Sequence, residues 1–128
     1  MAEYLALDDL LVLATDLGVP KVRDLGLLDA AAHRPQSSLM GQDAYPGLHE
    51  KAAVLLESVV RNHPLIDGNK RLSWMAAFVF YGLNGVDLDA PEDGAYDLVI
   101  AAATGVLAHA EVAERLSAWA PLGQQPVG

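Results

Sequence analysis

Two helical stretches joined by a short break constrain this chain most. Residues 48–62 carry apolar side chains at helical spacing on one face, and residues 69–83 are apolar almost all the way round. A helix with so little polar surface is typical of the buried centre of a bundle. The dipeptide His63-Pro64 ends the first helix, because a residue before proline avoids the α-helical region. We therefore predict an all-α fold with residues 69–83 at its centre.

Shorter segments with helical spacing lie on both sides of this central pair. Several begin with an aspartate or a proline, which favour the first turn of a helix. The pattern predicts a compact bundle of about six helices, with a motif loop between the two central ones. The expected helices run from Asp8 or Asp9 to Leu17, from Asp24 to about Ala32, from Leu48 to Asn62, from Asn69 to about Leu83, from Pro91 to Ala103 and from Ala110 to Trp119.

The remaining segments lack a helical period. Residues 34–47 are expected to form a loop, at a length where loops often serve as lids or binding flaps; a plain surface excursion explains the length equally well. A short extended piece is expected near Tyr4–Leu7 or Asp87–Leu88. We predict a single domain over residues 1–120 and a flexible tail over residues 121–128, which are rich in Gly, Pro and Gln.

Composition limits the class of protein. The 128 residues contain 8 Lys and Arg, 17 Asp and Glu and no Cys, for a formal charge of -9. The lack of cysteine excludes disulfides, thiol catalysis and Cys-based zinc sites, and is compatible with a cytoplasmic protein. The acidic balance argues against direct nucleic-acid or membrane binding, since both need a basic surface. The acidic start does not resemble a signal peptide, and no apolar run reaches the ~18 residues of a membrane span.

The charge is unevenly distributed along the chain. Residues 58–86 contain Arg61, Lys70 and Arg71 against the single acid Asp67, whereas the other residues carry 5 bases and 16 acids. A local excess of cations beside a Gly-Asn dipeptide indicates anion binding. A buried centre that excludes acids would give the same pattern, so charge alone leaves both interpretations open.

The break between the central helices reads His-Pro-Leu-Ile-Asp-Gly-Asn-Lys-Arg from position 63 to position 71. It leads into a helix N-terminus, where unpaired N–H groups and the positive end of the dipole favour an anion. Gly68 permits a positive φ or a close approach, and Asn69 is a good N-cap. The side chains of Lys70 and Arg71 can follow phosphate oxygens.

His63 and Asp67 add reactive groups to the same segment. An imidazole can accept a proton from a hydroxyl near neutral pH, and a carboxylate suits a Mg²⁺ that bridges phosphates. Phosphoryl or nucleotidyl transfer to a hydroxyl needs this combination of base, metal ligand and anion cradle. Taken singly, each residue also has a purely structural explanation. His63 could simply be the last residue of a helix, and Asp67 could form a turn or pair with Lys70 or Arg71. Leu65 and Ile66 are expected to be core anchors.

The nine-residue segment resembles the signature of the Fic/Doc superfamily, roughly His-Pro-Phe-x-[Asp/Glu]-Gly-Asn-[Gly/Lys]-Arg. Seven polar, Gly or Pro positions agree in order. Lys70, where AMP-transferring Fic proteins usually have glycine, is similar to the Doc (death-on-curing) branch. Residues 18–36 and 50–53 also look like Doc proteins, so the resemblance covers roughly residues 4–119 and implies a Fic/Doc-like fold.

The resemblance also implies a function. Doc-like proteins are toxins of toxin–antitoxin systems, and the branch implies a protein kinase that moves the γ-phosphate of ATP to a threonine of elongation factor Tu and so stops translation. Mg²⁺ would be the cofactor, and a Phd-like antitoxin the inhibitory partner, its C-terminal segment packed in a groove. By position, His63 resembles the catalytic base and Asp67 the Mg²⁺ ligand. The phosphate-holding turn would consist of Gly68, Asn69, Lys70 and Arg71.

Departures from the family pattern leave alternatives open. Fic proteins often carry a second arginine where this chain has Trp74, and Leu65 replaces the usual Phe. A Fic-type AMP transferase and a non-catalytic nucleotide- or antitoxin-binding relative remain alternatives, whereas a DNA-binding repressor would need a basic face. Arg34, Lys51 and Arg61 are secondary candidates for substrate or nucleotide contacts. Lys51 could instead form a surface salt bridge, and Arg61 could simply cap the end of a helix.

Overall fold

The structure is a computed structural model and describes residues 2–122. These residues form six α-helices, one 3-10 turn and one short hairpin, which confirms the predicted all-α class. No helix in this range combines the length and the apolar character needed to cross a bilayer. In chain order the elements are α1 (Leu7–Asp16), α2 (Leu25–His33), η1 (Arg34–Gln36), β1 (Ser38–Leu39), β2 (Gln42–Asp43), α3 (Leu48–Asn62), α4 (Asn69–Leu83), α5 (Glu92–Thr104) and α6 (His109–Trp119).

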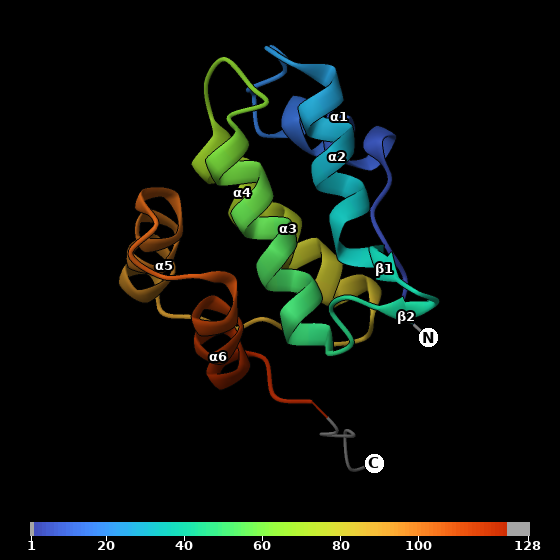
Figure 1. The fold of residues 1–128 in the computed structure, drawn as a ribbon. Helices are drawn as coiled ribbons and strands as arrows, with labels where there is room; N and C mark the ends of the chain where they lie inside the picture. The colour runs from blue at the N-terminus through green and yellow to red at the C-terminus, as the bar shows by residue number, and fades with distance from the viewer. Residues whose placement is uncertain (1, 123–128) are drawn as a thin grey trace.

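Helix α3 is the centre of the bundle. It packs against α2, η1, α4, α5 and α6, and every residue from 51 to 60 is buried. Figure 1 shows α1 and α2 on one side of α3 and α5 and α6 on the other. The prediction that α4 is the centre was wrong, because α4 leaves Phe78 46% and Leu83 47% exposed. An all-apolar helix can keep a solvent-facing side, since scattered apolar residues are common on protein surfaces.

Two charged residues of α3, Lys51 and Glu57, are buried, and each has an oppositely charged partner. The Lys51 ammonium lies 3.1 Å from the carboxylate of Asp43, and the Glu57 carboxylate lies 2.8 Å from the guanidinium of Arg34. A buried charge is costly unless it is paired and hydrogen-bonded. These two ion pairs therefore hold η1, which supplies Arg34, and the hairpin, which supplies Asp43, against α3.

Most helix boundaries agree with the predictions, and the first one differs. Asp24 caps α2, because its side chain accepts a hydrogen bond from the Leu27 N–H at 3.0 Å. Helix α1 begins at Leu7, earlier than expected, with Ala6 as its N-cap. Asp9 is therefore inside the first turn, and its carboxylate accepts a hydrogen bond from the Ala6 N–H at 2.8 Å. The expectation that Asp8 or Asp9 is the N-cap was wrong by two or three residues.

Residues 34–47 are more ordered than a plain loop. Ser38 pairs with Asp43 and Leu39 with Gln42, in an antiparallel hairpin whose turn contains Met40 and Gly41. Both turn residues have positive φ, 53° for Met40 and 79° for Gly41, as a tight hairpin turn requires. The extended pieces expected near residues 4–7 and 87–88 form no strand in the described chain. Of the predicted tail 121–128, residues 123–128 lie outside the described residues.

A hydrogen-bonded pair joins the start of α3 to the end of α4. Nδ1 of His49 lies 2.6 Å from the hydroxyl of Tyr81, and Tyr81 is fully buried. Burial lowers the pKa of His49 and raises the pKa of Tyr81. The tyrosine hydroxyl therefore stays protonated beside a neutral imidazole, and the hydrogen bond between them joins two uncharged groups.

This pair predicts a loss of stability in mild acid. A histidine whose pKa is lowered by folding binds its proton first in the unfolded chain, so stability present above about pH 6.5 is lost as the pH falls. Thermal unfolding measured at about pH 7.5 and about pH 5.5 should show a falling midpoint. His49→Asn keeps an acceptor but cannot titrate, and should reduce this fall. Equal pH dependence in the two proteins would contradict the role given to His49.

Candidate active site

The predicted motif lies in a loop where two helices meet. α3 ends at Asn62 and α4 begins at Asn69, and Figure 1 shows this loop at the end of α3 remote from the hairpin. His63 is exposed and adopts a left-handed conformation, with φ 50° and ψ 54°. This region is uncommon for residues other than glycine and costs energy, so the surrounding contacts must impose it.

A backbone pairing with the segment before α2 fixes the loop. The N–H groups of Arg23 and Asp24 both donate to the Pro64 carbonyl, at 2.8 and 3.0 Å, and the Ile66 N–H donates to the Lys21 carbonyl at 2.9 Å. The loop is thus extended here, and successive side chains point to opposite sides.

The alternation explains a failed prediction. Leu65 is 1% exposed and anchors the loop in the core as expected, whereas Ile66 is 65% exposed. The expectation that Ile66 is also a core anchor was wrong, because an extended chain cannot bury two consecutive side chains on one face.

Arg23 holds the end of α3 directly. Its Nε donates to the His63 carbonyl at 2.7 Å, and its Nη2 donates to the Asn62 carbonyl at 2.9 Å. The last carbonyls of a helix lack partners within it and carry the negative end of the dipole, so a guanidinium both satisfies and neutralises them. Sequence reasoning missed Arg23, because 40 residues separate it from His63 and no local pattern joins the two.

Asn69 braces the loop from the other side. Its Oδ1 accepts from the Leu65 N–H at 2.9 Å, and its Nδ2 donates to the Leu65 carbonyl at 3.0 Å. Gly68, and not Asn69, is the N-cap of α4, so the prediction of an Asn69 cap was wrong. The Asn69 side chain bonds both backbone groups of Leu65, as a neighbouring strand would. It therefore does not cap the N–H groups of α4.

Two features of the loop require glycine at position 68. Its φ is 87°, in the region that favours glycine. A Cβ at this position would stand 2.5 to 2.8 Å from three side-chain carbons of Val19. The glycine therefore allows the loop to close against Val19, in the segment between α1 and α2.

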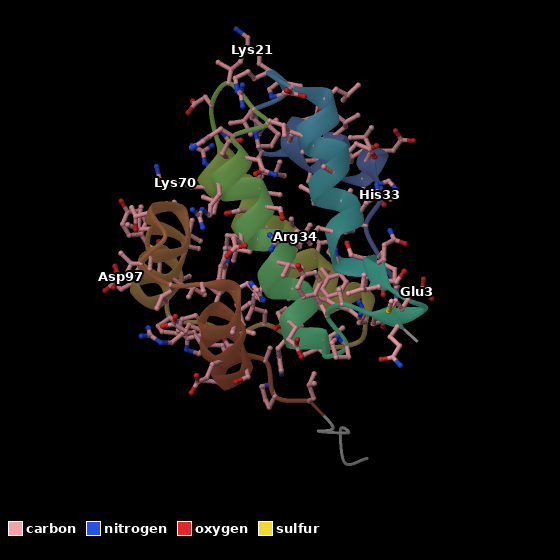
Figure 2. The ribbon with its side chains drawn as sticks, viewed as in Figure 1. Glu3, Lys21, His33, Arg34, Lys70 and Asp97 are labelled. Carbon is pink, nitrogen blue, oxygen red and sulfur yellow. The ribbon has the colours of Figure 1, made fainter. Side chains whose placement is uncertain are left out.

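The start of α4 is open to an anion. Its first backbone bond joins the Leu72 N–H to the Gly68 carbonyl at 2.9 Å, so the N–H groups of Asn69, Lys70 and Arg71 have no carbonyl partner within α4. Lys70 and Arg71 are exposed, and Figure 2 shows Lys70 at the side of α4 that faces α5. Both line a pocket of about 580 Å³ between these helices. Free N–H groups, the helix dipole and two cations thus meet at one place.

Asp67 lies beside the open end of α4. Its carboxylate is exposed, and one oxygen accepts from the Gly68 N–H at 2.9 Å. Within residues 2–122 it forms no ion pair with Lys70 or Arg71, which removes the alternative of a purely structural pair. Mg²⁺ in nucleotide sites is commonly held by one or two carboxylates together with phosphate oxygens, and Asp67 beside the open end of α4 fits that pattern.

The structure does not bring all the secondary candidates to the motif. Arg61 does lie close, at the end of α3, with its guanidinium 3.6 Å from where a Cβ of Gly105 would stand. Arg34 lies further back along α3 (Figure 2) and donates to Glu57 and to Ser58 at 2.8 and 2.9 Å. Burial alone would lower the pKa of Arg34, but the hydrogen bonds to Glu57 and Tyr45 outweigh it and raise the pKa.

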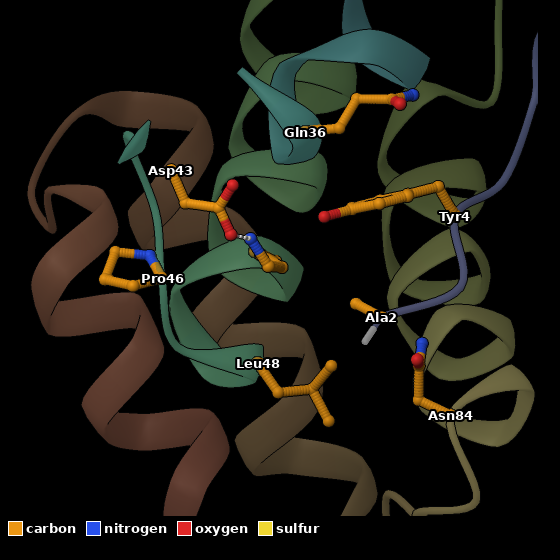
Figure 3. A pocket seen from close by; sticks show the side chains of 8 residues that line it. Ala2, Tyr4, Gln36, Asp43, Pro46, Leu48 and Asn84 are labelled. Carbon is orange, nitrogen blue, oxygen red and sulfur yellow. Dashed lines mark hydrogen bonds and ion pairs between the residues drawn. The ribbon is translucent and has the colours of Figure 1, made fainter. Parts of the chain in front are cut away.

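Lys51 lies about 18 Å along α3 from the motif loop, given the rise per residue of an α-helix. The Lys51 side chain forms a salt bridge, as the alternative expected, and its partner is Asp43. The salt bridge is not at the surface, however, because Lys51 is only 3% exposed. Lys51 lines a separate pocket of about 710 Å³ (Figure 3), with Gln36 and Asp43 on one wall and Tyr4 and Asn84 on another.

Comparison with known proteins places the chain. The sequence model of the Fic/DOC family matches residues 2–81, which run from the N-terminal segment through the motif and most of α4. The chain belongs to the Fic/Doc family. A protein of Mycolicibacterium smegmatis (strain ATCC 700084 / mc(2)155) named Toxin Doc is 47% identical over 128 residues, which cover 97% of this chain and 98% of that protein. The similarity to this Fic/Doc relative thus extends beyond α4.

The Arg23 contacts predict a stability effect. Arg23→Ala removes two charge-assisted hydrogen bonds at a solvent-exposed helix end and should lower the free energy of unfolding by about 1–2 kcal/mol. The matched control is Lys21→Ala in the same segment, because the structure uses only the backbone carbonyl of Lys21 in the pairing. Chemical denaturation checks both; equal effects in the two variants would contradict the capping role.

The Gly68 environment predicts a larger effect. Gly68→Ala combines a left-handed alanine with overlap against Val19 and should lower the free energy of unfolding by about 2–5 kcal/mol. Gly85→Ala has a similar φ of 75° but nothing within 4 Å of its added Cβ, so it should cost only about 1–2 kcal/mol. Denaturant unfolding of the two variants separates conformational strain from overlap; indistinguishable losses would rule out the Val19 contact as a cause.

Proposed function

We propose that this chain is a Doc-like toxin of a toxin–antitoxin system that acts as a protein kinase, transferring the γ-phosphate of ATP to a threonine hydroxyl of elongation factor Tu in the cytoplasm. The observation that carries the proposal is the convergence of His63, Asp67 and the open N-terminus of α4 in one loop. The likeness to a protein named Toxin Doc supports the toxin role. The resemblance of the motif to the Doc branch supports the choice of ATP as the donor and of elongation factor Tu as the target.

Each residue of the loop has a step to perform. The exposed imidazole of His63 takes the proton of the threonine hydroxyl, whose oxygen attacks the γ-phosphorus. The bond from this phosphorus to the oxygen that bridges it to the β-phosphate breaks, and ADP leaves with that oxygen. The N–H groups at the start of α4, together with Lys70 and Arg71, stabilise the charge on the phosphate oxygens. Mg²⁺, held by Asp67 when bound, would neutralise further phosphate charge.

Lys70 and Trp74 favour kinase chemistry over AMP transfer. In place of the glycine of AMP-transferring relatives, the Lys70 stem occupies space beside the turn that an α-phosphate and its nucleoside would need. In place of a second arginine, Trp74 offers no charge to the distal phosphates. The two differences act together against the AMP-transfer orientation.

A separate antitoxin is part of the proposal. A translation-stopping kinase must be restrained in the cell that makes it, and a Phd-like antitoxin whose C-terminal segment packs on the toxin would provide that restraint. The acidic remainder of the chain, outside residues 58–86, gives a basic segment of such a partner a complementary surface.

Parallel labelling tests the transfer. Purified chain, elongation factor Tu and Mg²⁺ are incubated with ATP labelled at the γ- or at the α-phosphate. Label from the γ-position alone is expected on elongation factor Tu, because only the terminal phosphate is transferred. Label from the α-position would establish AMP transfer, and an absence of both labels would favour the non-catalytic alternative.

His63→Ala provides the matching variant. It should abolish both the γ-label and the growth arrest caused by expression, a loss of at least about 100-fold in rate for removal of a general base. The control is His33→Ala, because His33 is an exposed histidine at the end of α2, where it contacts Asp29. Growth arrest that survives His63→Ala would contradict the proposed chemistry.

A further inference from the structure

Arg23 contacts three consecutive carbonyl groups where α3 passes into the motif loop. Its guanidinium donates from Nη2 to the Asn62 carbonyl at 2.9 Å and from Nε to the His63 carbonyl at 2.7 Å. Its backbone N–H donates to the next carbonyl, that of Pro64, at 2.8 Å. Within residues 2–122 the Arg23 side chain forms no ion pair, so these carbonyls are the partners that the structure gives to its charge.

The two guanidinium bonds act on the backbone angles of His63. The Asn62 carbonyl lies in the rigid peptide plane before the His63 Cα, and the His63 carbonyl lies in the plane after it. Only φ and ψ of His63 turn one plane relative to the other. A guanidinium is a planar fork with fixed N–H directions, so it bonds both oxygens only over a narrow range of these angles. Arg23 thereby selects the φ of 50° and the ψ of 54° that His63 adopts.

His63 would leave this conformation without a restraint. A left-handed conformation is unfavourable for a residue with a Cβ, and the following Pro64 shifts the preference of position 63 towards extended conformations. The next residues of the loop are held by other groups, since Asn69 bonds Leu65 and the Lys21 carbonyl bonds the Ile66 N–H. The restraint on His63 therefore comes from Arg23.

We propose that Arg23 is a positioning residue for the transfer reaction, because it holds the backbone of His63 in the conformation from which the imidazole reaches the acceptor hydroxyl. The inference rests on the proposed function, in which His63 takes the proton of that hydroxyl. The backbone angles fix the direction of the Cα–Cβ bond, so a relaxed His63 would carry its imidazole away from the start of α4. A misplacement of about 1 Å can cost about 100-fold in rate. Arg23 takes no proton itself, because a guanidinium stays charged in proteins.

Positioning requires the arginine fork, whereas neutralising a helix end requires only a positive charge. A lysine ammonium at position 23 would be a point charge on a flexible stem. It would still interact with the negative end of the α3 dipole, but it would not fix the angle between two peptide planes. Arg23→Lys should therefore retain a higher unfolding midpoint than Arg23→Ala and still lose reaction rate. This variant separates the two roles of Arg23.

Steady-state kinetics measure the effect on the reaction. Transfer of γ-label from ATP to elongation factor Tu is followed for the unmodified protein, Arg23→Ala, Arg23→Lys and Lys21→Ala. Both Arg23 variants should lower kcat about 10- to 100-fold and change the KM for ATP and for the acceptor by less than about 3-fold. Lys21→Ala is the control and should leave kcat unchanged. Millimolar guanidinium, far below denaturing concentrations, should restore part of the kcat of Arg23→Ala.

A comparison of backbone preferences at position 63 needs no activity. Glycine and alanine both lack the imidazole, and only glycine adopts a left-handed conformation freely. With Arg23 present, His63→Gly should therefore have a higher midpoint of urea unfolding than His63→Ala. In the Arg23→Ala background position 63 is free to leave the left-handed region. The advantage of glycine should then disappear or reverse, because glycine loses more chain entropy on folding.

Three results would overturn the inference. The first is a glycine advantage of equal size with and without Arg23, the second is an Arg23→Ala kcat no lower than that of Lys21→Ala, and the third is full kcat in Arg23→Lys. An unmodified protein that transfers no label would instead contradict the proposed kinase. The unfolding midpoints would still decide whether Arg23 sets the conformation of His63.

Discussion

The burial of α3 with its charges neutralised is the constraint on which the rest of the structure depends. Helix α3 carries Lys51 and Glu57 into the middle of the bundle, and each requires an opposite charge close by. Those charges come from η1 and the hairpin, so the segment between α2 and α3 folds against α3. α2, α4, α5 and α6 then surround α3 and present its last turn, with His63 just beyond it, at one end of the molecule.

A second constraint shapes the site itself. The loop from His63 to Gly68 has little structure of its own to hold it, and its conformation comes from residues 19–24, through backbone pairing, the Arg23 guanidinium and the Val19 side chain. The docking of the connection between α1 and α2 on the end of α3 therefore helps to form the candidate active site, together with the Asn69 side chain. The geometry of the candidate site and the tertiary fold are coupled in this region.

Sequence reasoning succeeded where the signal is local. Helical spacing, the Asp24 cap and the break at His63-Pro64 are properties of neighbouring residues, and the structure confirms them. It failed where contacts between distant segments decide. Helix α3 is central although its own pattern is amphipathic, because partners for Lys51 and Glu57 come from other elements. Ile66 is exposed and Asn69 bonds to Leu65 because the loop is extended against residues 21–24, which no local pattern reveals.

The left-handed backbone of His63 has an evolutionary consequence. The fold holds a non-glycine residue in a costly conformation at the centre of the proposed chemistry. Replacement by asparagine or glycine would relieve that strain while removing the imidazole, so loss of the proposed activity costs the protein little or no stability. Variants that have lost the proposed activity can therefore persist as well-folded proteins.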